Sequence, residues 1–461
     1  MQAKACTAKD DSTLDITYNT QRVDPVGLAV LLIAIVLILS PRRIYVYTGL
    51  VMLIAFLPGG QRIVIASLDF FFIRIGVLVG LMRCVLYQEF RLRSWTLVDT
   101  FVVAWVAWST ITQALILGTT SAAIARLGFG IDAAGMYFLA RFLVKTREDA
   151  IDLVRVVAIF AIATAPFFLF ESQTMRNVFS QLGGVPEYSM IRNGRLRCQG
   201  PFAHPIMAGV FWAMWLPTVI ALAISYGRYK TWWILGVIAI SFIVFTTASS
   251  TPAMGVILGV GCFCCFQLRR GLAIAVWTAL GLGGMLHLLM QNGVHSLLAR
   301  VNIVSGSTGW HRYHLMDEAI NHVGEWFLIG TEGTGHWGRE LQDVTNQFVL
   351  EAVRGGCLGL VFFSAVLFLV MRANAIMAIN ARDKVTAMLN WGFFSALFSM
   401  VFSFIGVSIF GSVISGYFLL QGAAISFAQA SEERVASRAR RKPRNNPPPR
   451  RPPGRYAGQT T

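Results

Sequence analysis

The sequence predicts an all-α, polytopic integral membrane protein with 12–13 membrane-spanning helices, and three observations lead to this prediction. Hydrophobic residues make up 55% of the 461 residues and charged residues only 13%, whereas soluble domains carry about 25% charged residues. The mean hydropathy is +0.60. Apolar runs recur at the length of about 20 residues that a bilayer core requires. This composition argues against an ordinary soluble enzyme, a coiled coil and a disordered chain.

The apolar runs define the expected spans in chain order. The first two runs are short, and Arg42 and Arg43 separate them, so they form either two short spans or one span with an interfacial segment. The later runs have the length of a membrane helix. The predicted spans are 26–40, 44–58, 66–87, 97–117, 122–143, 151–171, 205–225, 231–249, 252–268, 271–290, 346–371, 388–406 and 409–429.

Lysine and arginine occupy every second connection between these spans, and such connections normally face the cytoplasm. The alternate connections then face outward, and two of them are long, 172–204 and 291–345. Long loops in a compact membrane protein are where function concentrates. The basic residues are Arg91, Arg93, Lys145, Arg147, Arg228, Lys230, Arg269, Arg270, Arg382 and Lys384, and the outward connections are 118–121, 172–204, 250–251, 291–345 and 407–408.

These boundaries divide the chain into membrane-embedded groups of helices and segments outside the membrane. We expect the large outer loop to contain short helices. The predicted segments are a polar N-terminal segment (1–25), N-terminal transmembrane helices (26–171), a basic outer loop (172–204), central transmembrane helices (205–290), a large outer loop (291–345), C-terminal transmembrane helices (346–429) and a disordered, basic, Pro-rich cytoplasmic tail (430–461).

The formal net charge of +16 has three candidate meanings: a nucleic-acid footprint, a site for an anionic substrate, or a topology signal. Segment 430–461 contains nine basic and two acidic residues, together with prolines that break helices. We interpret it as an anchor near anionic membrane lipids. Nucleic acid is not an expected partner, because no fold with aromatic stacking accompanies the basic residues.

The two long outer loops carry opposite charge. Loop 172–204 has four arginines and one acid, whereas loop 291–345 has three arginines and six acids, and six of the 7 histidines lie in these two loops. This division suits an anionic substrate that arginine binds and that a carboxylate or imidazole activates. Two solvated loops that pair with each other would give the same pattern, and the residues alone leave both interpretations open.

Two local patterns in the large loop suggest ligand binding. Residues 333–338 match G-x-G-x-x-G, but a dinucleotide fingerprint must open a helix after a strand, so a flexible turn is the better interpretation. His314, Glu318 and His322 share one face of an expected helix, as metal ligands do. Because metal sites usually show a tighter signature, we favour polar pairing and expect no metal site.

Several charged residues lie inside the predicted spans, where an unpaired charge costs several kcal/mol. Arg83, Asp99 and Arg141 lie near span ends and are expected to reach the membrane surface. Arg74 and Arg126 lie deeper. They either bind a diphosphate or pair with nearby Asp69 and Asp132.

A resemblance to a known family rests on the order of several short motifs. Residues 197–205, Arg-Cys-Gln-Gly-Pro-Phe-Ala-His-Pro, resemble the R-x-x-G-x-F-x-x-P stretch of the O-antigen ligase and polymerase family. Gly-Trp-His-Arg at 309–312, the glycine turn at 333–335, Thr-Asn-Gln-Phe at 345–348 and Gly-Gly-Cys-Leu-Gly-Leu at 355–360 follow in that family's order. The phrase Gly-Gly-Val-Pro-Glu at 183–187 is similar to exopolysaccharide-type members.

The resemblance implies a C-type glycosyltransferase of the bacterial inner membrane, with the two long loops in the periplasm and the C-terminus in the cytoplasm. The donor would be a glycan on undecaprenyl diphosphate. The acceptor would be a second lipid-linked repeat unit for a polymerase, or lipid A-core for a ligase. Such enzymes need no metal and no cofactor, and their partners are the lipid-linked substrates and membrane lipids.

The resemblance also assigns roles to residues. Arg197 and Arg312 would hold the diphosphate, which suits the fork geometry of guanidinium. Ligases often carry a histidine where this chain has Thr345, and a threonine hydroxyl is no base at neutral pH. Asp343 or His336 would therefore act as the base, which favours a polymerase-like member. Further substrate contacts are expected from Arg195, His204, Asn346, Arg74 and Arg126.

Two other functions remain as alternatives. A transporter or flippase of lipid-linked sugars would explain arginines inside the spans, although no inverted repeat is apparent. A scaffold that recruits cytoplasmic partners would explain the basic tail.

Overall fold

The computed structural model describes residues 23–65, 68–90, 92, 94–290, 293, 296–297 and 309–440. Helices dominate this part of the chain, and its β-structure is limited to two short antiparallel hairpins and one isolated bridge. Eight described helices are long and apolar enough to cross a membrane, and three shorter apolar helices accompany them. The protein is therefore an all-α, multi-pass membrane protein. Residues 1–22 of the predicted N-terminal segment (1–25) and residues 441–461 of the predicted tail (430–461) lie outside the described residues.

A helix occurs within every predicted span. The helices are α2 (Pro25–Ile38), α3 (Arg43–Ala55), α4 (Phe72–Leu86), α5 (Leu97–Leu117), α6 (Thr120–Gly130), α7 (Met136–Leu143), α8 (Arg147–Thr174), α9 (Pro205–Ser225), α10 (Lys230–Thr246), α11 (Ser250–Cys264), α12 (Leu272–Leu289), α13 (Gly309–Asn321), α14 (Val323–Trp326), α15 (Gln347–Asn380), α16 (Lys384–Gly406) and α17 (Ser412–Arg440), with a π-helical turn at Ile131–Gly135 between α6 and α7.

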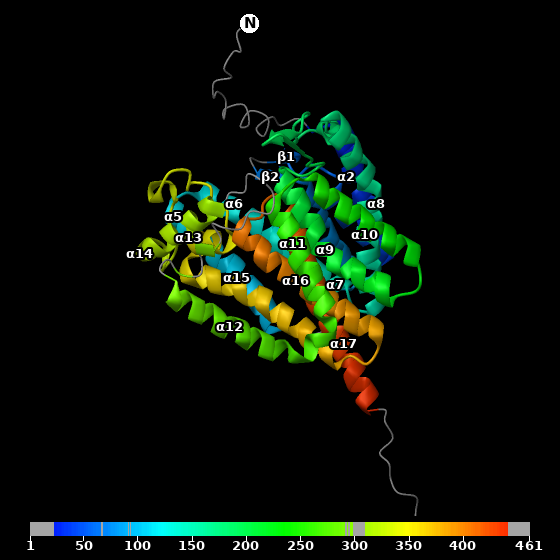
Figure 1. The fold of residues 1–461 in the computed structure, drawn as a ribbon. Coiled ribbons are helices and arrows are strands. Elements are labelled where there is room, and N and C mark those ends of the chain that lie inside the picture. The colour runs from blue at the N-terminus through cyan, green and yellow to red at the C-terminus, as the bar shows by residue number, and fades with distance from the viewer. Residues whose placement is uncertain are drawn as a thin grey trace, which may run out of the picture.

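Helices α9, α16 and α17 form the centre of the bundle, and most of their side chains are buried. They are apolar on nearly all faces, as expected of helices surrounded by other helices. The small residues Gly255 and Gly259 bring α11 against α16, since a Cβ at either position would lie 3.0 Å or less from Ser399. The G-x-x-x-G spacing thus lets the two helices approach closely. Helix α12 has no buried residue and lies on the outside of the bundle (Figure 1).

The predicted span 66–87 does not begin as a helix in the part of it that the structure describes. Residues 62–71 contain the strands β1 (Arg62–Ile65) and β2 (Leu68–Phe71), which pair as a hairpin, so α4 begins only at Phe72. Asp69 lies in this hairpin and pairs with Arg62 at 3.3 Å. A helical span from residue 66 would have carried the Asp69 carboxylate toward the bilayer, and the hairpin avoids that cost.

The expectation that Asp99 and Arg141 reach the membrane surface is wrong. Both side chains are buried, and the Arg141 guanidinium donates to both carboxylate oxygens of Asp99 at 2.9 Å. Tyr137 donates to the same carboxylate, and Gln429 accepts from Arg141 at 2.6 Å. The charges are thus neutralised inside the bundle instead of by water. Arg83 is also fully buried, where it bonds the carbonyls of residues 40 and 41 and pairs with Glu89.

The connections predicted to be cytoplasmic meet at one end of the bundle. Ion pairs link them there: Arg43 with Glu89 and Asp149, Arg147 with Asp383, and Arg434 with Glu148. Helix α17 continues through this end to Arg440, so residues 430–440 are helical and their predicted disorder is wrong. The end of α17 projects from the bundle on the side opposite α13, α14 and the β1–β2 hairpin (Figure 1). The alternating distribution of basic connections therefore corresponds to two opposite faces.

Candidate functional site

A cavity of about 530 Å³ opens at the face opposite the end of α17. Its walls come from four parts of the chain that lie far apart in sequence, and all four belong to or border connections that the charge pattern places on the outer side. The polar lining residues are Arg192, His204, His311, Arg312, Glu340, Gln342, Asp343, Thr345 and Ser408. Among the predicted site residues, the fold thus brings together His204, Arg312 and Asp343.

Arg312 projects from α13 and is fixed by two membrane helices. Its Nε donates to the carbonyl oxygen of Gly406 at 3.0 Å, and its Nη2 donates to Thr251 Oγ1 at 2.9 Å. Gly406 ends α16 and Thr251 lies in the first turn of α11. Burial, with a smaller contribution from nearby Arg192, lowers the pKa of Arg312. The guanidinium is therefore held in place without a carboxylate to neutralise it.

Arg197 lies at the end of the hairpin formed by β3 (Met190–Arg192) and β4 (Arg195–Arg197). It is not among the residues that line the cavity, but it lies close enough to His204 to act on it electrostatically. It is only 3% exposed. Its Nη2 donates to Ser249 Oγ at 2.6 Å, whereas its buried Nε has no hydrogen-bond partner. Burial and the adjacent positive charge of Arg192 lower the pKa of Arg197 to about 10. It still carries its charge at neutral pH, and no carboxylate of the described residues pairs with it.

A buried carboxylate positions the turn that follows Arg197. Glu171, near the end of α8, is 1% exposed and accepts hydrogen bonds from the backbone N–H groups of Gln199 and Gly200, both at 2.9 Å. Gly200 has a φ of +56°, and a Cβ there would lie 2.6 Å from the ring of Phe168. Only glycine fits this turn without strain. The motif at 197–205 therefore forms a rigid turn that leads from Arg197 to His204.

His204 begins α9 as its N-cap, and its Nδ1 accepts a hydrogen bond from the N–H of Ile206 at 3.1 Å. Burial, followed by the positive charges of Arg197 and Arg192, lowers the pKa of His204 to about 4. The imidazole is therefore neutral at physiological pH. Because Nδ1 accepts, the single ring proton lies on Nε2. His204 can donate a hydrogen bond to a ligand, but it has no free lone pair with which to act as a base.

The acidic groups of the cavity are Glu340 and Asp343, which are both exposed and follow the turn at 333–338. Thr345 lies beside them with a buried hydroxyl that has no hydrogen-bond partner. The cavity lining thus combines two arginines, Arg192 and Arg312, with two carboxylates, and Arg197 lies near His204. This combination can hold an anionic group and accept a proton.

Three other predicted site residues do not line the cavity: His336, Arg195 and Asn346. His336 Nε2 bonds Glu325 at 2.7 Å, in a cluster with Trp337 that does not line the cavity. Arg195 is exposed on β4. The side chain of Asn346 has a structural role, because its Oδ1 caps α15 by accepting from two backbone N–H groups and its Nδ2 donates to the carbonyl of Ile405.

The arginines inside the spans are also separate from the cavity. Arg74 forms a bidentate pair with Asp132 at 2.7 and 2.9 Å and bonds the carbonyl of Asp69 at 2.6 Å. It therefore makes the ion pair that the sequence offered as one alternative. Arg126 does not share this arrangement, since its buried Nε and Nη2 have no hydrogen-bond partner.

The predicted helix carrying His314, Glu318 and His322 is present as α13, in which His322 is the residue that follows the last turn. The Glu318 carboxylate lies 3.8 Å from His314 Nδ1 and 3.4 Å from His322 Nδ1. His322 also stacks on Trp337. Polar pairing and ring stacking therefore account for these side chains. No set of three or more potential metal ligands occurs among the residues that the structure describes.

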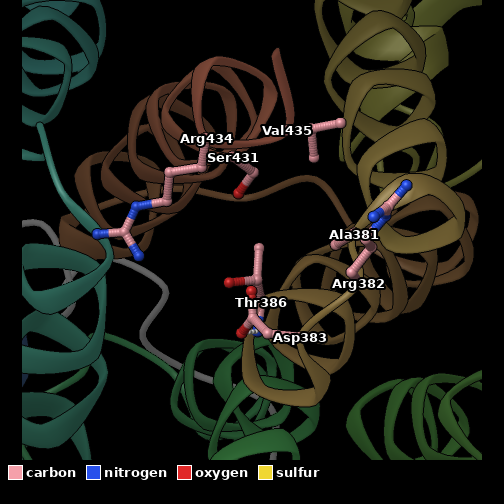
Figure 2. Close-up of a pocket in the computed structure, with 7 residues that line it drawn as sticks. All are labelled: Ala381, Arg382, Asp383, Thr386, Ser431, Arg434 and Val435. Atoms are coloured by element: carbon pink, nitrogen blue, oxygen red, sulfur yellow. Dashed lines mark hydrogen bonds between the residues drawn. The ribbon is translucent and has the colours of Figure 1, made fainter. Parts of the chain in front are cut away.

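A second, smaller pocket of about 60 Å³ lies at the opposite end of the bundle, between α17 and the α15–α16 connection (Figure 2). Two of its charged residues, Arg434 and Asp383, already have partners. Arg434 points away from Ser431 and Thr386 and pairs with Glu148 at 3.1 Å (Figure 2). Asp383 caps α16 through the N–H of Thr386 and pairs with Arg147. The outer cavity is the better candidate for chemistry.

The residues of the cavity environment that sequence reasoning missed include Arg192, His311, Glu340 and Glu171. Arg192 was visible as one of four arginines in loop 172–204, and His311 lies next to Arg312 in the motif at 309–312. Glu171 gave no signal, because its role depends on backbone groups that approach it only in the folded chain. No family model matches this chain, and no curated protein does either.

Proposed function

We propose that this protein is a bacterial membrane glycosyltransferase that polymerises glycan units carried on undecaprenyl diphosphate at the periplasmic face of the inner membrane. The observation that carries the proposal is the outer cavity, whose lining combines Arg192, Arg312 and His204 with Asp343 and Glu340, while Arg197 lies close enough to act electrostatically on His204. The resemblance of the motifs at 197–205, 309–312 and 345–348 supports the same function. Neither a metal nor a nucleotide is invoked.

The reaction requires one bond to form and one to break. The acceptor hydroxyl oxygen attacks the anomeric carbon of the donor, and the bond between that carbon and the diphosphate oxygen breaks. Asp343 takes the hydroxyl proton, which keeps the acceptor oxygen nucleophilic. The leaving diphosphate gains one negative charge, and the guanidinium groups of Arg312 and Arg192 in the cavity lining stabilise it. Arg197, outside the lining, adds positive potential. His204 donates a hydrogen bond from Nε2 to the bound substrate.

The two hydrogen bonds that hold Arg312 in place support its proposed role in stabilising the diphosphate. Its guanidinium is bonded to a carbonyl and a hydroxyl, both neutral, so an arriving diphosphate supplies the counter-charge that the protein does not. Electrostatic groups that are positioned in advance stabilise a charged leaving group without the cost of reorganisation.

A ligase that transfers glycan to lipid A-core is the second candidate, because the same cavity chemistry serves both acceptors. Thr345, at the position where ligases often have histidine, favours the polymerase. Transport of lipid-linked sugars is less favoured, since the uncompensated arginines of the cavity lie at one face and not at the middle of the bundle.

A deletion strain complemented with Arg197→Ala tests the proposal. We expect the variant to insert into the membrane at the normal level and to yield no polymer, while lipid-linked single repeat units accumulate. Normal polymer from this variant would overturn the proposal. Full-length polymer that lacks its final attachment would instead identify the ligase.

A further inference from the structure

Helix α15 is broken at Gly356, close to the face that carries the cavity. Gly356 has φ +62° and ψ −162°, which interrupts the helical hydrogen bonds. Side chains of α5 satisfy the carbonyls that the break releases. Thr112 Oγ1 and Gln113 Nε2 donate to the carbonyl of Arg354, and Trp108 Nε1 donates to that of Gly355. The break therefore lies in a polar, ordered environment inside a membrane helix.

Two arginines lie beside this break, and only one carboxylate acts on them. Arg126 of α6 is 8% exposed, and its Nε and Nη2 are buried without a hydrogen-bond partner. Arg354 of α15 is half-buried and repels Arg126 electrostatically, while Glu351 attracts both. Glu351 already accepts from Trp105 Nε1 and Gln347 Nε2, each at 2.7 Å.

The charges of this group do not balance. Among the described residues, two guanidinium groups against one carboxylate leave one uncompensated positive charge in an environment where such a charge costs several kcal/mol. Arg74, which lies in the neighbouring helix α4, shows the contrast, because Asp132 neutralises it in bidentate geometry. Helices α5, α6 and α15 lie in the same corner of the molecule as α13 and α14 (Figure 1).

The surroundings of the two arginines point toward lipid. Leu127 follows Arg126 in the sequence, and Leu358 lies one turn along α15 from Arg354. Both leucines are exposed apolar side chains. Gly130, one turn along α6 from Arg126, lines an apolar groove of about 680 Å³ between α4, α5, α6 and α7. Residues four apart share a helix face, so the groove begins one turn from the Arg126 guanidinium.

We propose that Arg126 and Arg354 bind the phosphate group of a lipid whose hydrocarbon chain lies along the groove at Gly130. The phosphate supplies the missing negative charge and accepts from the free nitrogens of Arg126. This site is separate from the outer cavity, and the proposal stands whether or not the cavity performs glycosyl transfer.

Native mass spectrometry of the purified full-length protein tests the proposal, with dioleoyl phosphatidic acid as the probe. Dioleoylglycerol has the same chains without phosphate, and inorganic phosphate has no chains. We expect Arg126→Gln/Arg354→Gln to lose one bound phosphatidic acid, with affinity at that site reduced at least about tenfold, since charge-assisted hydrogen bonds are removed. Arg372→Gln, which removes an exposed charge from the same helix α15, should bind like the wild type.

Equal phosphatidic acid binding by the double variant and the wild type overturns the site, as does equally tight binding of dioleoylglycerol. If inorganic phosphate binds as tightly as phosphatidic acid, the claim that the ligand is a lipid is overturned. If the double variant does not fold, Arg354→Gln replaces it, because that arginine is only half-buried. We also expect Arg126→Gln to raise the melting temperature in lipid-free detergent, and a fall with unchanged lipid binding would show a purely structural role.

Discussion

Arg312 of the outer helix α13 donates from Nε to the carbonyl oxygen of Gly406, the last residue of membrane helix α16, at 3.0 Å. This bond, together with the bond to Thr251, joins the large loop to the membrane bundle at the cavity wall. The loop residues that line the cavity are thus positioned by helices inside the membrane.

The first prediction concerns this link. Arg312→Lys keeps the charge but has no planar fork, so it cannot hold both bonds in the same geometry. We expect the transfer rate to fall by about 10- to 100-fold, with a normal amount of inserted protein. Gly406→Ala should act in the same direction, because its Cβ would lie 3.0 Å from Thr251 Oγ1 and 3.4 Å from Arg312 Nε. Transfer at the wild-type rate by both variants would show that the link is not needed.

The second prediction separates the two candidate bases. Asp343 lines the cavity, whereas His336 is bonded to Glu325 outside it. Asp343→Asn should therefore lower the rate by about 100-fold or more, as loss of a general base does. His336→Gln should change the rate less than about threefold. Rates measured on membranes with a fixed amount of protein decide between them, and the reverse result would make His336 the base.

Glu340 provides the matched control for Asp343. It is a second exposed carboxylate on the same cavity wall, so Glu340→Gln removes the same charge from nearly the same place. We expect a smaller loss than for Asp343→Asn. A larger loss would move the role of the base to Glu340.

The third prediction concerns pH. The pKa of His204 is about 4 in the folded protein, mainly because of burial, against about 6.5 when the chain is unfolded. Between these values the unfolded chain binds the extra proton, so His204 makes the protein less stable as pH falls from about 6.5 toward 4. His204→Asn keeps a side chain that can cap α9 but cannot take up this proton. Its melting temperature should fall less than that of the wild type between about pH 7.5 and pH 5. Equal falls would contradict the buried, neutral imidazole.

The fourth prediction concerns the break in α15. A Cβ at Gly356 would lie 2.4 Å from the carbonyl oxygen of Leu328, and the positive φ adds strain. Gly356→Ala should therefore release residues 327–331 from the break, where Cys357 N–H now bonds the carbonyl of Phe327 at 2.8 Å. We expect a loss of about 3 kcal/mol or more in stability and faster proteolysis of that loop.

Gly283→Ala serves as its control, because Gly283 lies in helix α12 and has open space around its Cβ position. It should leave both stability and proteolysis nearly unchanged. Equal behaviour of the two alanine variants would mean that the break at Gly356 tolerates a side chain.

Much of the fold follows from the sequence, because a membrane helix must satisfy its backbone internally over a length set by the bilayer. The apolar runs therefore located the helices. Hydropathy did not predict the hairpin at 62–71 or the burial of Asp99 and Arg141. Asp99 lies 42 residues from Arg141, and only the folded bundle shows that the two charges neutralise each other.

The sequence predicts those site residues that short motifs indicate. His204, Arg312 and Asp343 were identified from motifs, and they meet at one cavity. His336, in the glycine turn, is the alternative base that the sequence suggests, yet its hydrogen bond to Glu325 holds it away from the cavity lining. Arg126 and Arg74 were paired because both lie within spans, but Asp132 neutralises only Arg74, and Arg354 approaches Arg126 from a helix more than two hundred residues later.

The most direct test of the proposed function uses the purified protein in liposomes with a lipid-linked repeat unit and follows the length of the lipid-linked glycan. The wild type should lengthen the glycan and release undecaprenyl diphosphate in equal amount. Arg197→Gln and Asp343→Asn should each abolish lengthening, while Arg372→Gln should retain it. A wild-type protein that lengthens no glycan but moves the lipid-linked unit across the membrane would contradict the account.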